Sequence, residues 1–417
     1  MLLLPTTGYR NEDFLTAAQN LNIEIIPVAN YCHELAPLWG MAPLKAVPFD
    51  QPHRALRQIL NALGDLVPDA VLAVDDLGLT LASLLSAHFR LPGNPPEAVQ
   101  ILRDKLLFRQ FLSTHGFPAP AFVHVHHIAQ LDKLNFTFPV VVKPRRLSGS
   151  RGVIRANNKL ELEVAVRRVQ HIQKRADREA VKLGVIVESF LSGDEIALEG
   201  ILVQGTLQIL AVFDKPDPLN GPFFEETLYL TPSRLSPHQQ EFIREQIEAV
   251  TRLCGIHTGP IHAEARVNTK GVWLLEIAPR SIGGLCGRVL RYSLGMSLEE
   301  LILRNALQLA LPPCTTGSAS GVMMIPIPKR GIFLGVDGLE RARSIRHISD
   351  IQISAEVGQA LITLPEGASY LGFIFARGPS ITEVEQALRN AHAALNFTIA
   401  VEVPLYLKDQ LAATAPR

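Results

Sequence analysis

The chain of 417 residues is long enough to form two to four globular domains. Apolar residues make up 47 % of it and charged residues 19 %, a balance that supports buried cores and excludes global disorder. Because 40 basic and 40 acidic residues cancel, the net charge excludes a general attraction to nucleic acid or to an anionic membrane surface.

Residues 1–95 alternate short apolar strands with helical patterns. The opening run MLLL lacks a preceding basic segment and is only four residues long, so it predicts a strand and not a signal peptide. The other predicted elements are strands at 23–30 and 69–76 and helices at 11–20, 53–66 and 77–89. This alternation is typical of a parallel sheet covered by helices on both faces, so we expect a Rossmann-like N-terminal α/β domain.

The proline-rich segment PGNPP at 92–96 ends this alternation and opens a second predicted domain, residues 96–311. The main elements predicted in it are helices at 97–116, 159–182, 236–255 and 298–311 and strands around 136–144, 184–213 and 259–280. The run PPCTTGSASG at 312–321 indicates a further boundary. Beyond it, several strands and one helix predict a β-rich α+β domain over residues 317–417.

The cysteines and the hydropathy bear on the compartment. No C-x-x-C pair occurs among the four cysteines, Cys32, Cys254, Cys286 and Cys314. We interpret them as reduced, mostly buried thiols. No window approaches the roughly 20 apolar residues that span a bilayer. We therefore expect a cytoplasmic protein with neither a membrane nor a nucleic acid as its partner.

The segment HAEARVNTKGVWLLEIAPR, residues 262–280, predicts two strands joined by a tight turn. With a three-residue turn, Thr269–Lys270–Gly271, and glycine in the left-handed region, Glu264 lies opposite Glu276. Directly opposed carboxylates destabilise a sheet unless a cation lies between them or one stays protonated. Mg²⁺ is a suitable cation, because it takes one or two carboxylates and completes its shell with phosphate and water.

The same register places His262 opposite Ala278 and Arg266 opposite Leu274. An alternative interpretation places both glutamates on the solvent face of an edge hairpin, where Arg266 pairs with them. The hairpin alone does not decide between these two interpretations.

Lysines and a glycine-rich loop predict a phosphate site. Lys143 ends the strand VVVK, and the loop Ser148–Gly149–Ser150–Arg151–Gly152 follows it. Successive backbone N–H groups in such loops form a concavity for phosphate oxygens, although the P-loop pattern itself is absent. Lys105, at the start of a helix, is a second candidate for the same phosphates; its alternative is a solvated helix lysine.

The stretch VIVESFLSGDEIALEG offers a third cluster. Glu188 ends an apolar strand, Leu191 follows, and Glu195 comes after a turn. Extended backbone there can bind an adenine edge, and the later carboxylate can accept hydrogen bonds from ribose hydroxyls. A plain strand edge facing solvent is the alternative.

The order of these motifs resembles the ATP-grasp superfamily over roughly residues 1–310: D-K on a helix, V-V-K-P before a glycine loop, V-E-S-F-L-x-G-x-E, H-A-E and L-L-E-I-A-P-R. The G-P-x-H-A-E and E-I-x-P-R-x-x-G-G versions, with a C-terminal β-rich domain, are most similar to the L-amino-acid ligases and related carboxylate–amine ligases. The resemblance implies an ATP-grasp fold flanked by the two other domains.

The resemblance also implies roles for single residues. It implies that the nucleotide phosphates are bound by Lys105, Lys143 and the loop residues Ser148, Gly149, Ser150 and Gly152. It implies that Glu188 and the backbone near Leu191 bind adenine and that Glu195 binds ribose. It implies that Glu264 and Glu276 bind Mg²⁺, with Mn²⁺ as an alternative ion. It implies that Arg280 stabilises the transferring phosphoryl group. It implies Gly283, Gly284 and Arg288 for the substrate carboxylate.

One position departs from the superfamily. Many relatives carry asparagine two residues after the second metal glutamate, where this chain has Ala278. Alanine binds no metal, which bears on the number of ions. Our hypothesis is that His262 or a water molecule takes the vacated polar place.

The implied function is an ATP-dependent carboxylate–amine ligase that forms an acyl phosphate. Its implied partners are ATP, a small carboxylate such as an amino acid, and an amine; a homodimer is a further expectation. The loop at 213–227 is a candidate lid, in which Lys215 and Glu226 are candidate substrate contacts; a surface loop is the alternative. Biotin-carboxylase-like carboxylation and a non-catalytic ATP-binding subunit are the competing functions.

Overall fold

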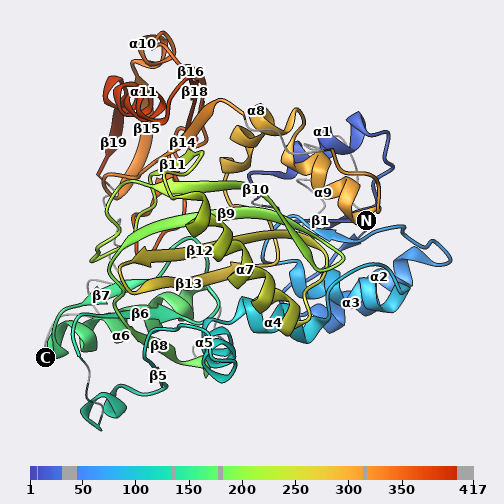
Figure 1. The fold of residues 1–417 in the computed structure, drawn as a ribbon, viewed down its shortest axis with the longest axis horizontal. Coiled ribbons are helices and arrows are strands. Elements are labelled where there is room, and N and C mark those ends of the chain that lie inside the picture. The colour runs from blue at the N-terminus through green and yellow to red at the C-terminus, as the bar shows by residue number, and fades with distance from the viewer. Residues whose placement is uncertain are drawn as a thin grey trace, which may run out of the picture.

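The computed structural model describes residues 1–6, 8–30, 45–133, 135, 137–176, 182–312 and 317–401 of the chain. A parallel sheet, a large central sheet and two smaller sheets make up the fold (Figure 1). Within the described residues, no helix combines the length and the hydropathy that a bilayer crossing needs.

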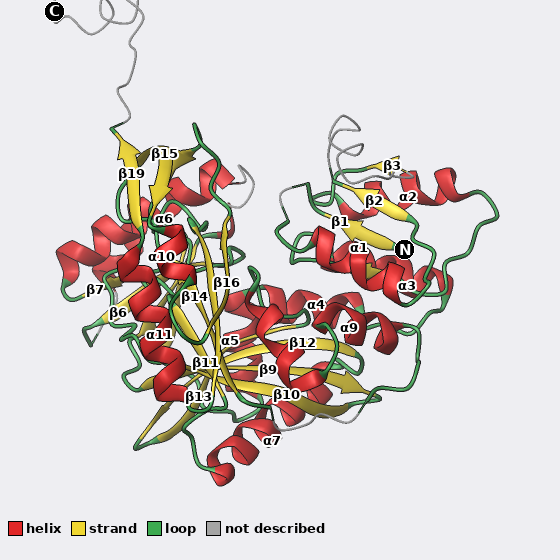
Figure 2. Ribbon diagram, turned by 90° about the horizontal axis from the view of Figure 1, so that it is seen from above, coloured by secondary structure: helices red, strands yellow, loops and turns green. Residues whose placement is uncertain are grey.

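The N-terminal domain contains the predicted parallel sheet, in the order β3-β2-β1-β4. Its strands are β1 (Leu2–Leu4), β2 (Pro27–Ala29), β3 (Lys45–Ala46) and β4 (Leu72–Ala73), and its helices are α1 (Asn11–Asn20), α2 (Pro52–Leu63) and α3 (Leu79–Phe89). The leucines of β1 are at most 2 % exposed, as expected for a strand covered on both faces. Figure 2 shows this domain beside the main body. Segments that follow β1 and β4 reach the cavity described below.

The helix predicted over 97–116 is in fact two helices, α4 (Pro96–Arg103) and α5 (Lys105–Thr114). Asp104 separates them, because its backbone is extended and its carboxylate accepts hydrogen bonds from the Leu106 and Leu107 amides. The break puts Lys105 at the first position of α5.

A small antiparallel sheet, in the order β5-β8-β6-β7, carries the glycine-rich loop. Its strands are β5 (Phe122–Val125), β6 (Val140–Pro144), β7 (Ile154–Ala156) and β8 (Val185–Ser189). Helix α6 (Lys159–Ala176) packs its buried residues on this sheet. The loop of residues 145–153 joins β6 to β7, so the sheet fixes both of its ends.

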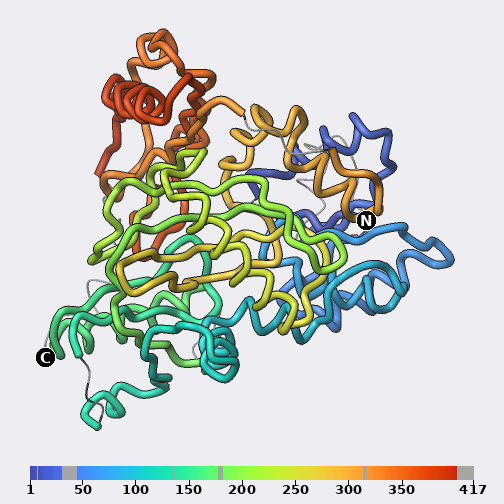
Figure 3. Tube along the Cα trace, in the orientation of Figure 1, coloured from blue at the N-terminus to red at the C-terminus, as the bar shows by residue number. Residues whose placement is uncertain are grey.

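The central sheet has eight strands in the order β13-β12-β9-β10-β11-β14-β18-β16. They are β9 (Asp194–Val203), β10 (Thr206–Lys215), β11 (Leu228–Thr231), β12 (Gly259–Asn268), β13 (Gly271–Ala278), β14 (Ala319–Ile325), β16 (Ile348–Ile353) and β18 (Gly372–Gly378). The boundary predicted near 312–316 does not interrupt this sheet, since β14 pairs with β11. The C-terminal segment therefore extends the central sheet, and its orange-to-red trace lies beside the central strands in Figure 3.

Helices cover both faces of the central sheet. On one face, α4, α5 and α7 (Pro237–Cys254) enclose a core with β9, β12 and β13. On the other, α1, α8 (Arg291–Leu294) and α9 (Leu298–Ala306) pack with residues of β9, β10 and β18. The last segment adds α10 (Leu339–Arg343), α11 (Ile381–Ala394) and the sheet of β17 (Ala360–Leu361), β15 (Gly331–Asp337) and β19 (Asn396–Ala400).

The hairpin of β12 and β13 has the predicted pairs Glu264–Glu276 and His262–Ala278. The predicted pair Arg266–Leu274 is wrong, because Arg266 lies opposite Trp273.

Two differences from the prediction compensate for each other. The turn contains two residues and not three, because Gly271, at φ +129°, pairs with Asn268 instead of lying in the left-handed helical region. Leu275 then forms a β-bulge between Leu274 and Glu276. The extra residue restores the predicted register at the glutamates.

Candidate active site

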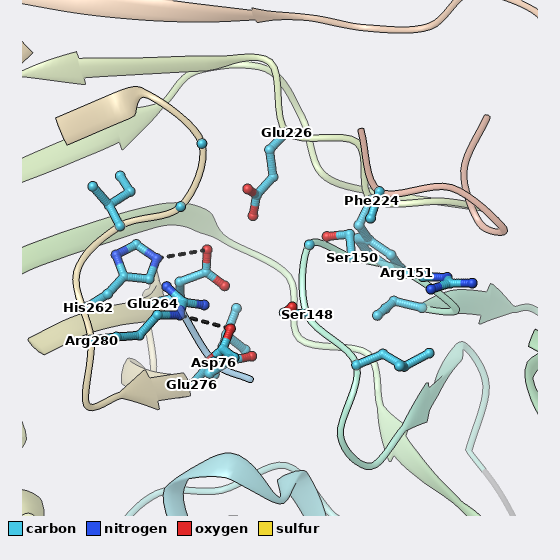
Figure 4. A pocket seen from close by; sticks show the side chains of 18 of the residues that line it. Asp76, Ser148, Ser150, Arg151, Phe224, Glu226, His262, Glu264, Glu276 and Arg280 are labelled. Atoms are coloured by element: carbon cyan, nitrogen blue, oxygen red, sulfur yellow. Dashed lines mark ion pairs between the residues drawn. The ribbon is translucent and has the colours of Figure 1, made fainter. Parts of the chain in front are cut away.

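A cavity of about 540 Å³ lies where the N-terminal domain, the small sheet, the central sheet and the C-terminal segment meet. That volume is within the usual range for ligand sites. The cavity brings together every predicted site residue except Gly152, Lys215 and Arg288. Figure 4 shows part of its lining, with Glu264 and Glu276 on one side and the glycine-rich loop on the other.

Cations gather at one end of the cavity. The cationic side chains of this group are Arg103, Lys105, Lys143, Arg146 and Arg280. Lys105 Nζ lies 3.3 Å from a carboxylate oxygen of Glu276 and donates to the Leu147 carbonyl at 2.8 Å. This end is suited to several phosphate groups.

The Glu188 carboxylate is paired with two cations in a buried ion cluster. Its carboxylate lies 2.7 Å from Lys143 Nζ and 2.7 Å from Arg109 Nε, and both Glu188 and Arg109 are at most 2 % exposed. Burial alone would raise the pKa of Glu188, but Arg109 and Lys143 outweigh it and lower the pKa to about 2. The geometry gives the Glu188 side chain a role in holding Lys143; its predicted contact with adenine stays a prediction.

Arg109 also completes the bulged strand. Its guanidinium donates to the carbonyls of Leu274 and Leu275, at 3.3 Å and 2.9 Å. The β-bulge removes these carbonyls from regular pairing, and Arg109 supplies donors for them. One buried side chain thus connects the lysine of β6 to the strand that carries Glu276.

The glycine-rich loop is fixed against the C-terminal segment. Gly152 N donates to the Pro365 carbonyl at 2.9 Å, and Arg151 Nε donates to the Glu366 carbonyl at 2.9 Å. Gly149 and Ser150 have φ values of +62° and +54° and line the cavity with Ser148. The loop therefore closes one wall of the cavity; its role in phosphate binding stays a prediction.

The opposed glutamates have different surroundings. Glu264 Oε1 lies 2.5 Å from Lys215 Nζ and 3.8 Å from His262 Nε2. His262 Nδ1 lies 3.2 Å from Glu199, which is fully buried and also accepts from the Ile282 amide at 3.0 Å. Burial alone would lower the pKa of His262, but its contacts with Glu199 and Glu264 raise it to about 9. His262 lies opposite Ala278, and its role in the vacated place stays a prediction.

Lys215 neutralises three carboxylates at once. Besides Glu264, its Nζ lies 3.0 Å from Glu195 and 2.9 Å from Glu226. Burial raises the pKa of Glu226 to about 7, and the repulsion from Glu264 and Glu195 adds to the rise despite Lys215. Of the two predicted lid residues, Glu226 lines the cavity, whereas Lys215 is outside the lining and contacts it through these carboxylates.

Arg266 fixes the same region from β12. Its Nε donates to Glu195 at 3.0 Å, and its Nη1 donates to the Leu191 carbonyl at 2.5 Å. Together with Lys215, Arg266 occupies both carboxylate oxygens of Glu195. Arg266 also donates to the Leu219 carbonyl, which anchors the loop of residues 216–227. The ribose role of Glu195 stays a prediction.

Arg280 pairs with the N-terminal domain. Its Nε lies 2.8 Å from Asp76 Oδ2, and its Nη1 donates to the Ser281 carbonyl at 2.9 Å. Burial alone would raise the pKa of Asp76, but Arg280 and Arg103 outweigh it and lower the pKa. Burial and the neighbouring Asp76 raise the pKa of Asp75 to about 6.

Another part of the cavity lining is mostly apolar. Tyr9, Cys286, Met324 and Tyr370 line it, together with Gly283 and Gly284. Gly284 has φ +58°, and a Cβ there would lie 2.9 Å from the Phe373 ring. This close approach explains the glycine. Cys254 and Cys286 are free, buried thiols; Cys32 and Cys314 lie outside the described residues.

The prediction for Arg288 is not supported by its position. Its guanidinium pairs with both carboxylate oxygens of Asp13, at 3.0 Å and 2.9 Å, and donates to Gln352 at 2.6 Å. Arg288 is absent from the cavity lining. It connects α1 to the central region.

The sequence analysis did not predict several residues that line the site or support it: Tyr9, Asp76, Arg103, Arg109, Arg146, Glu199, Met324 and Tyr370. For Asp76 a signal existed, because two aspartates end a strand of a parallel sheet, where ligands of such sheets bind. The segment of Tyr9 follows β1 in the same way.

Comparisons with known proteins agree with this geometry. The family model for the ATP-grasp domain matches residues 136–289, and the one for the L-amino acid ligase C-terminal domain 2 matches residues 323–400. The crystal structure of an L-amino acid ligase from Bacillus licheniformis has a TM-score of 0.83 and 25 % identity, and the alignment covers 96 % of this chain and 98 % of that one.

Two curated relatives are similar in sequence. Carnosine synthase 1 from Gallus gallus is 27 % identical over 71 % of this chain and 34 % of its own length. Dapdiamide A synthase from Enterobacter agglomerans is 26 % identical over 60 % of each chain. The alignments thus span about a third and three fifths of these relatives. The chain therefore contains an ATP-grasp domain and an L-amino acid ligase C-terminal domain 2, and it is similar over nearly its whole length to an L-amino-acid ligase.

Proposed function

We propose that this protein is an ATP-dependent ligase that joins the carboxylate of an amino acid, or of a similar small acid, to an amine. The observation that carries the proposal is the opposition of Glu264 and Glu276 in a cavity whose cations suit a triphosphate. The names of the similar proteins, two of them synthases and one an L-amino-acid ligase, support the same class.

The residues present fit a magnesium ion. Glu264 and Glu276 offer hard oxygen ligands on facing strands, and their repulsion favours a cation. When bound, Mg²⁺ would neutralise charge on the phosphate oxygens. Ala278 offers no ligand, and His262 is already bonded to Glu199; we therefore assign no second ion to this hairpin.

The chain's own groups then act by position and charge. Lys105, Lys143 and the glycine-rich loop hold the phosphates, and Glu188 with Arg109 keeps Lys143 in place. A substrate carboxylate oxygen attacks the γ-phosphorus, and the bond to the β,γ-bridging oxygen breaks, giving an acyl phosphate and ADP. Arg280 stabilises the charge that develops on the transferring group.

The second step forms the amide. The amine attacks the acyl carbon, loses a proton and expels phosphate, so no protein nucleophile is required. Glu226, which Lys215 holds in place, and the anchored loop of residues 216–227 would exclude water from the acyl phosphate.

The apolar end of the cavity favours an amino acid with an uncharged side chain. That side chain would contact Tyr9, Met324 and Tyr370. The carboxylate of Glu226 would accept hydrogen bonds from the ammonium group of the amino acid. Arg10, the cation at this end, is already paired with Glu299 at 2.8 Å and donates to Ser281 at 2.6 Å. It is therefore not free to bind an acidic side chain.

We also propose a cytoplasmic location, which the two free buried thiols support. The homodimer stays a prediction.

The test is a screen for ADP release over pairs of amino acids and small carboxylates, with mass spectrometry of the products. We expect Mg²⁺-dependent ADP release with at least one pair, and its loss in Glu276→Ala. Turnover with bicarbonate alone would favour a carboxylase. ATP binding without ADP release under every pair would favour a non-catalytic subunit.

A further inference from the structure

Arg280 is held by a carboxylate from another domain. Its Nε lies 2.8 Å from Oδ2 of Asp76, which follows β4 of the N-terminal sheet, while Arg280 follows β13 of the central sheet. Figure 4 shows the two side chains directed toward each other beside Glu276. We propose that Asp76 is a positioning residue that aims the Arg280 guanidinium at the transferring phosphoryl group, so that the N-terminal domain takes part in phosphoryl transfer.

The contacts of Arg280 determine its orientation. A guanidinium is planar, so fixing two of its nitrogens also fixes the third. Nε faces Asp76 and Nη1 donates to the Ser281 carbonyl. Among the residues that the structure describes, Nη2 has no hydrogen-bond partner, and it is left for a ligand in the cavity that Arg280 lines.

The charges around Asp76 explain why a carboxylate is needed there. Burial lowers the pKa of Arg103, and the nearby cations Arg146 and Arg280 lower it further, while Asp76 acts in the opposite direction. Asp76 interacts with Arg280, Arg103 and Lys105. A single carboxylate therefore keeps several cations near one another before any phosphate arrives, and without it their repulsion would move Arg280 away.

Asp76 is suited to this role, whereas its neighbour is not. Asp75 accepts a hydrogen bond from the Leu77 amide at 2.9 Å, so it stabilises the turn between β4 and α3. The Asp76 side chain is 29 % exposed and the Arg280 side chain 12 % exposed. The pair is therefore partly buried, and thermal unfolding has to be measured beside kcat to separate a loss of stability from a loss of positioning.

The inference rests on the proposed function, and a double-mutant cycle separates the two. The variants are Asp76→Asn, Arg280→Ala and the double variant, with Asp76→Glu for rescue. Asp65→Asn, an exposed aspartate of the same domain, is the matched control. ADP release with the parent's best substrate pair gives kcat and the KM for ATP, and thermal unfolding reports folding.

We expect Asp76→Asn to lower kcat on the order of tenfold to a hundredfold, with the KM for ATP changed by less than about threefold. In the Arg280→Ala background the same substitution should have almost no further effect, because it acts through Arg280. Asp76→Glu should recover part of kcat, and Asp65→Asn should match the parent.

Two results would overturn the inference while leaving the proposed function intact. One is a folded Asp76→Asn variant with the parent's kcat. The other is an equal fold-loss in both backgrounds, which means that Asp76 acts independently of Arg280. If Asp76→Asn does not fold, the cycle is run with Asp76→Glu, whose smaller loss must also disappear in the Arg280→Ala background. A parent that releases no ADP would overturn the proposed function and this inference together.

Discussion

Glu264 and Glu276 lie directly opposite each other on strands β12 and β13, and both line the cavity. Each has a lysine beside it: Lys215 lies 2.5 Å from Glu264, and Lys105 lies 3.3 Å from Glu276. Opposed carboxylates destabilise a sheet, so the pair needs these cations or a metal ion. The two lysines neutralise the pair in this structure, and a magnesium ion bound by both glutamates would add to that neutralisation.

The first prediction concerns this pair. Glu276→Gln should abolish most ADP release, because it removes a magnesium ligand. Without nucleotide, the variant should be no less stable than the parent, because it also removes the repulsion. In the parent, Mg·ADP at about 100 times its Kd should raise the free energy of unfolding by about 2.7 kcal/mol, and most of this gain should be lost in the variant. An equal gain in both proteins, measured by thermal unfolding, would refute the metal site.

The second prediction concerns Glu188. Its folded pKa, about 2, is below the usual value of 4.5, so its stabilisation is complete above about pH 4.5 and is lost as the pH falls toward 2. At pH 7, Glu188→Gln should lower the free energy of unfolding by about 3–5 kcal/mol, because Arg109 and Lys143 lose their counter-charge.

Urea unfolding at several pH values checks this prediction. The difference between parent and Glu188→Gln should shrink by about 3 kcal/mol between pH 4.5 and pH 2. Glu356→Gln, at an exposed position, is the control and should show neither effect. A difference that is independent of pH would contradict the assigned ion cluster.

The third prediction concerns Lys215. In Lys215→Met the carboxylates of Glu195, Glu226 and Glu264, which offer oxygens within 4.8 Å of one another, lose their shared cation. The variant should lose about 3–5 kcal/mol of unfolding free energy without divalent ions. Millimolar Ca²⁺ or Mg²⁺ should restore part of it, and the exposed Lys270→Met control should not respond. Equal ion responses in the two variants would disprove the shared neutralisation.

The fourth prediction concerns the apolar end. Tyr370→Ala should lower kcat/KM for amino acids with large apolar side chains by about tenfold or more, because it removes an aromatic wall. The KM for ATP should stay the same, and Phe242→Ala, on the exposed side of α7, should have no effect. Unchanged kcat/KM across a panel of amino acids would show that the side chain binds elsewhere.

The sequence predicts the hairpin's central pairs but not all of its details. The Glu264–Glu276 register came out right because the shorter turn and the bulge at Leu275 offset each other. A bulge depends on tertiary partners, here the Arg109 guanidinium that takes the freed carbonyls. Nothing in the spacing of the strand residues encodes that partner.

Local motifs predicted Lys105, Lys143 and the glycine-rich loop as lining one site, and the structure brings them together. Residues that reach the site from distant segments were missed, because their convergence depends on how domains pack. Asp76 and Tyr370 are examples, and Arg288 is the converse: its motif suggested a ligand contact, yet Asp13 of α1 takes its guanidinium. Spacing also could not show that Glu188 is committed to Arg109.

The most direct test of the ligase mechanism follows oxygen from substrate to phosphate. The parent is given ATP, an amine and a carboxylate substrate labelled with ¹⁸O, and the released phosphate is analysed by mass spectrometry. Attack of the carboxylate on the γ-phosphorus predicts ADP, one amide product per ADP and one ¹⁸O atom in each phosphate. Unlabelled phosphate, or AMP and pyrophosphate in place of ADP, would contradict the acyl-phosphate mechanism.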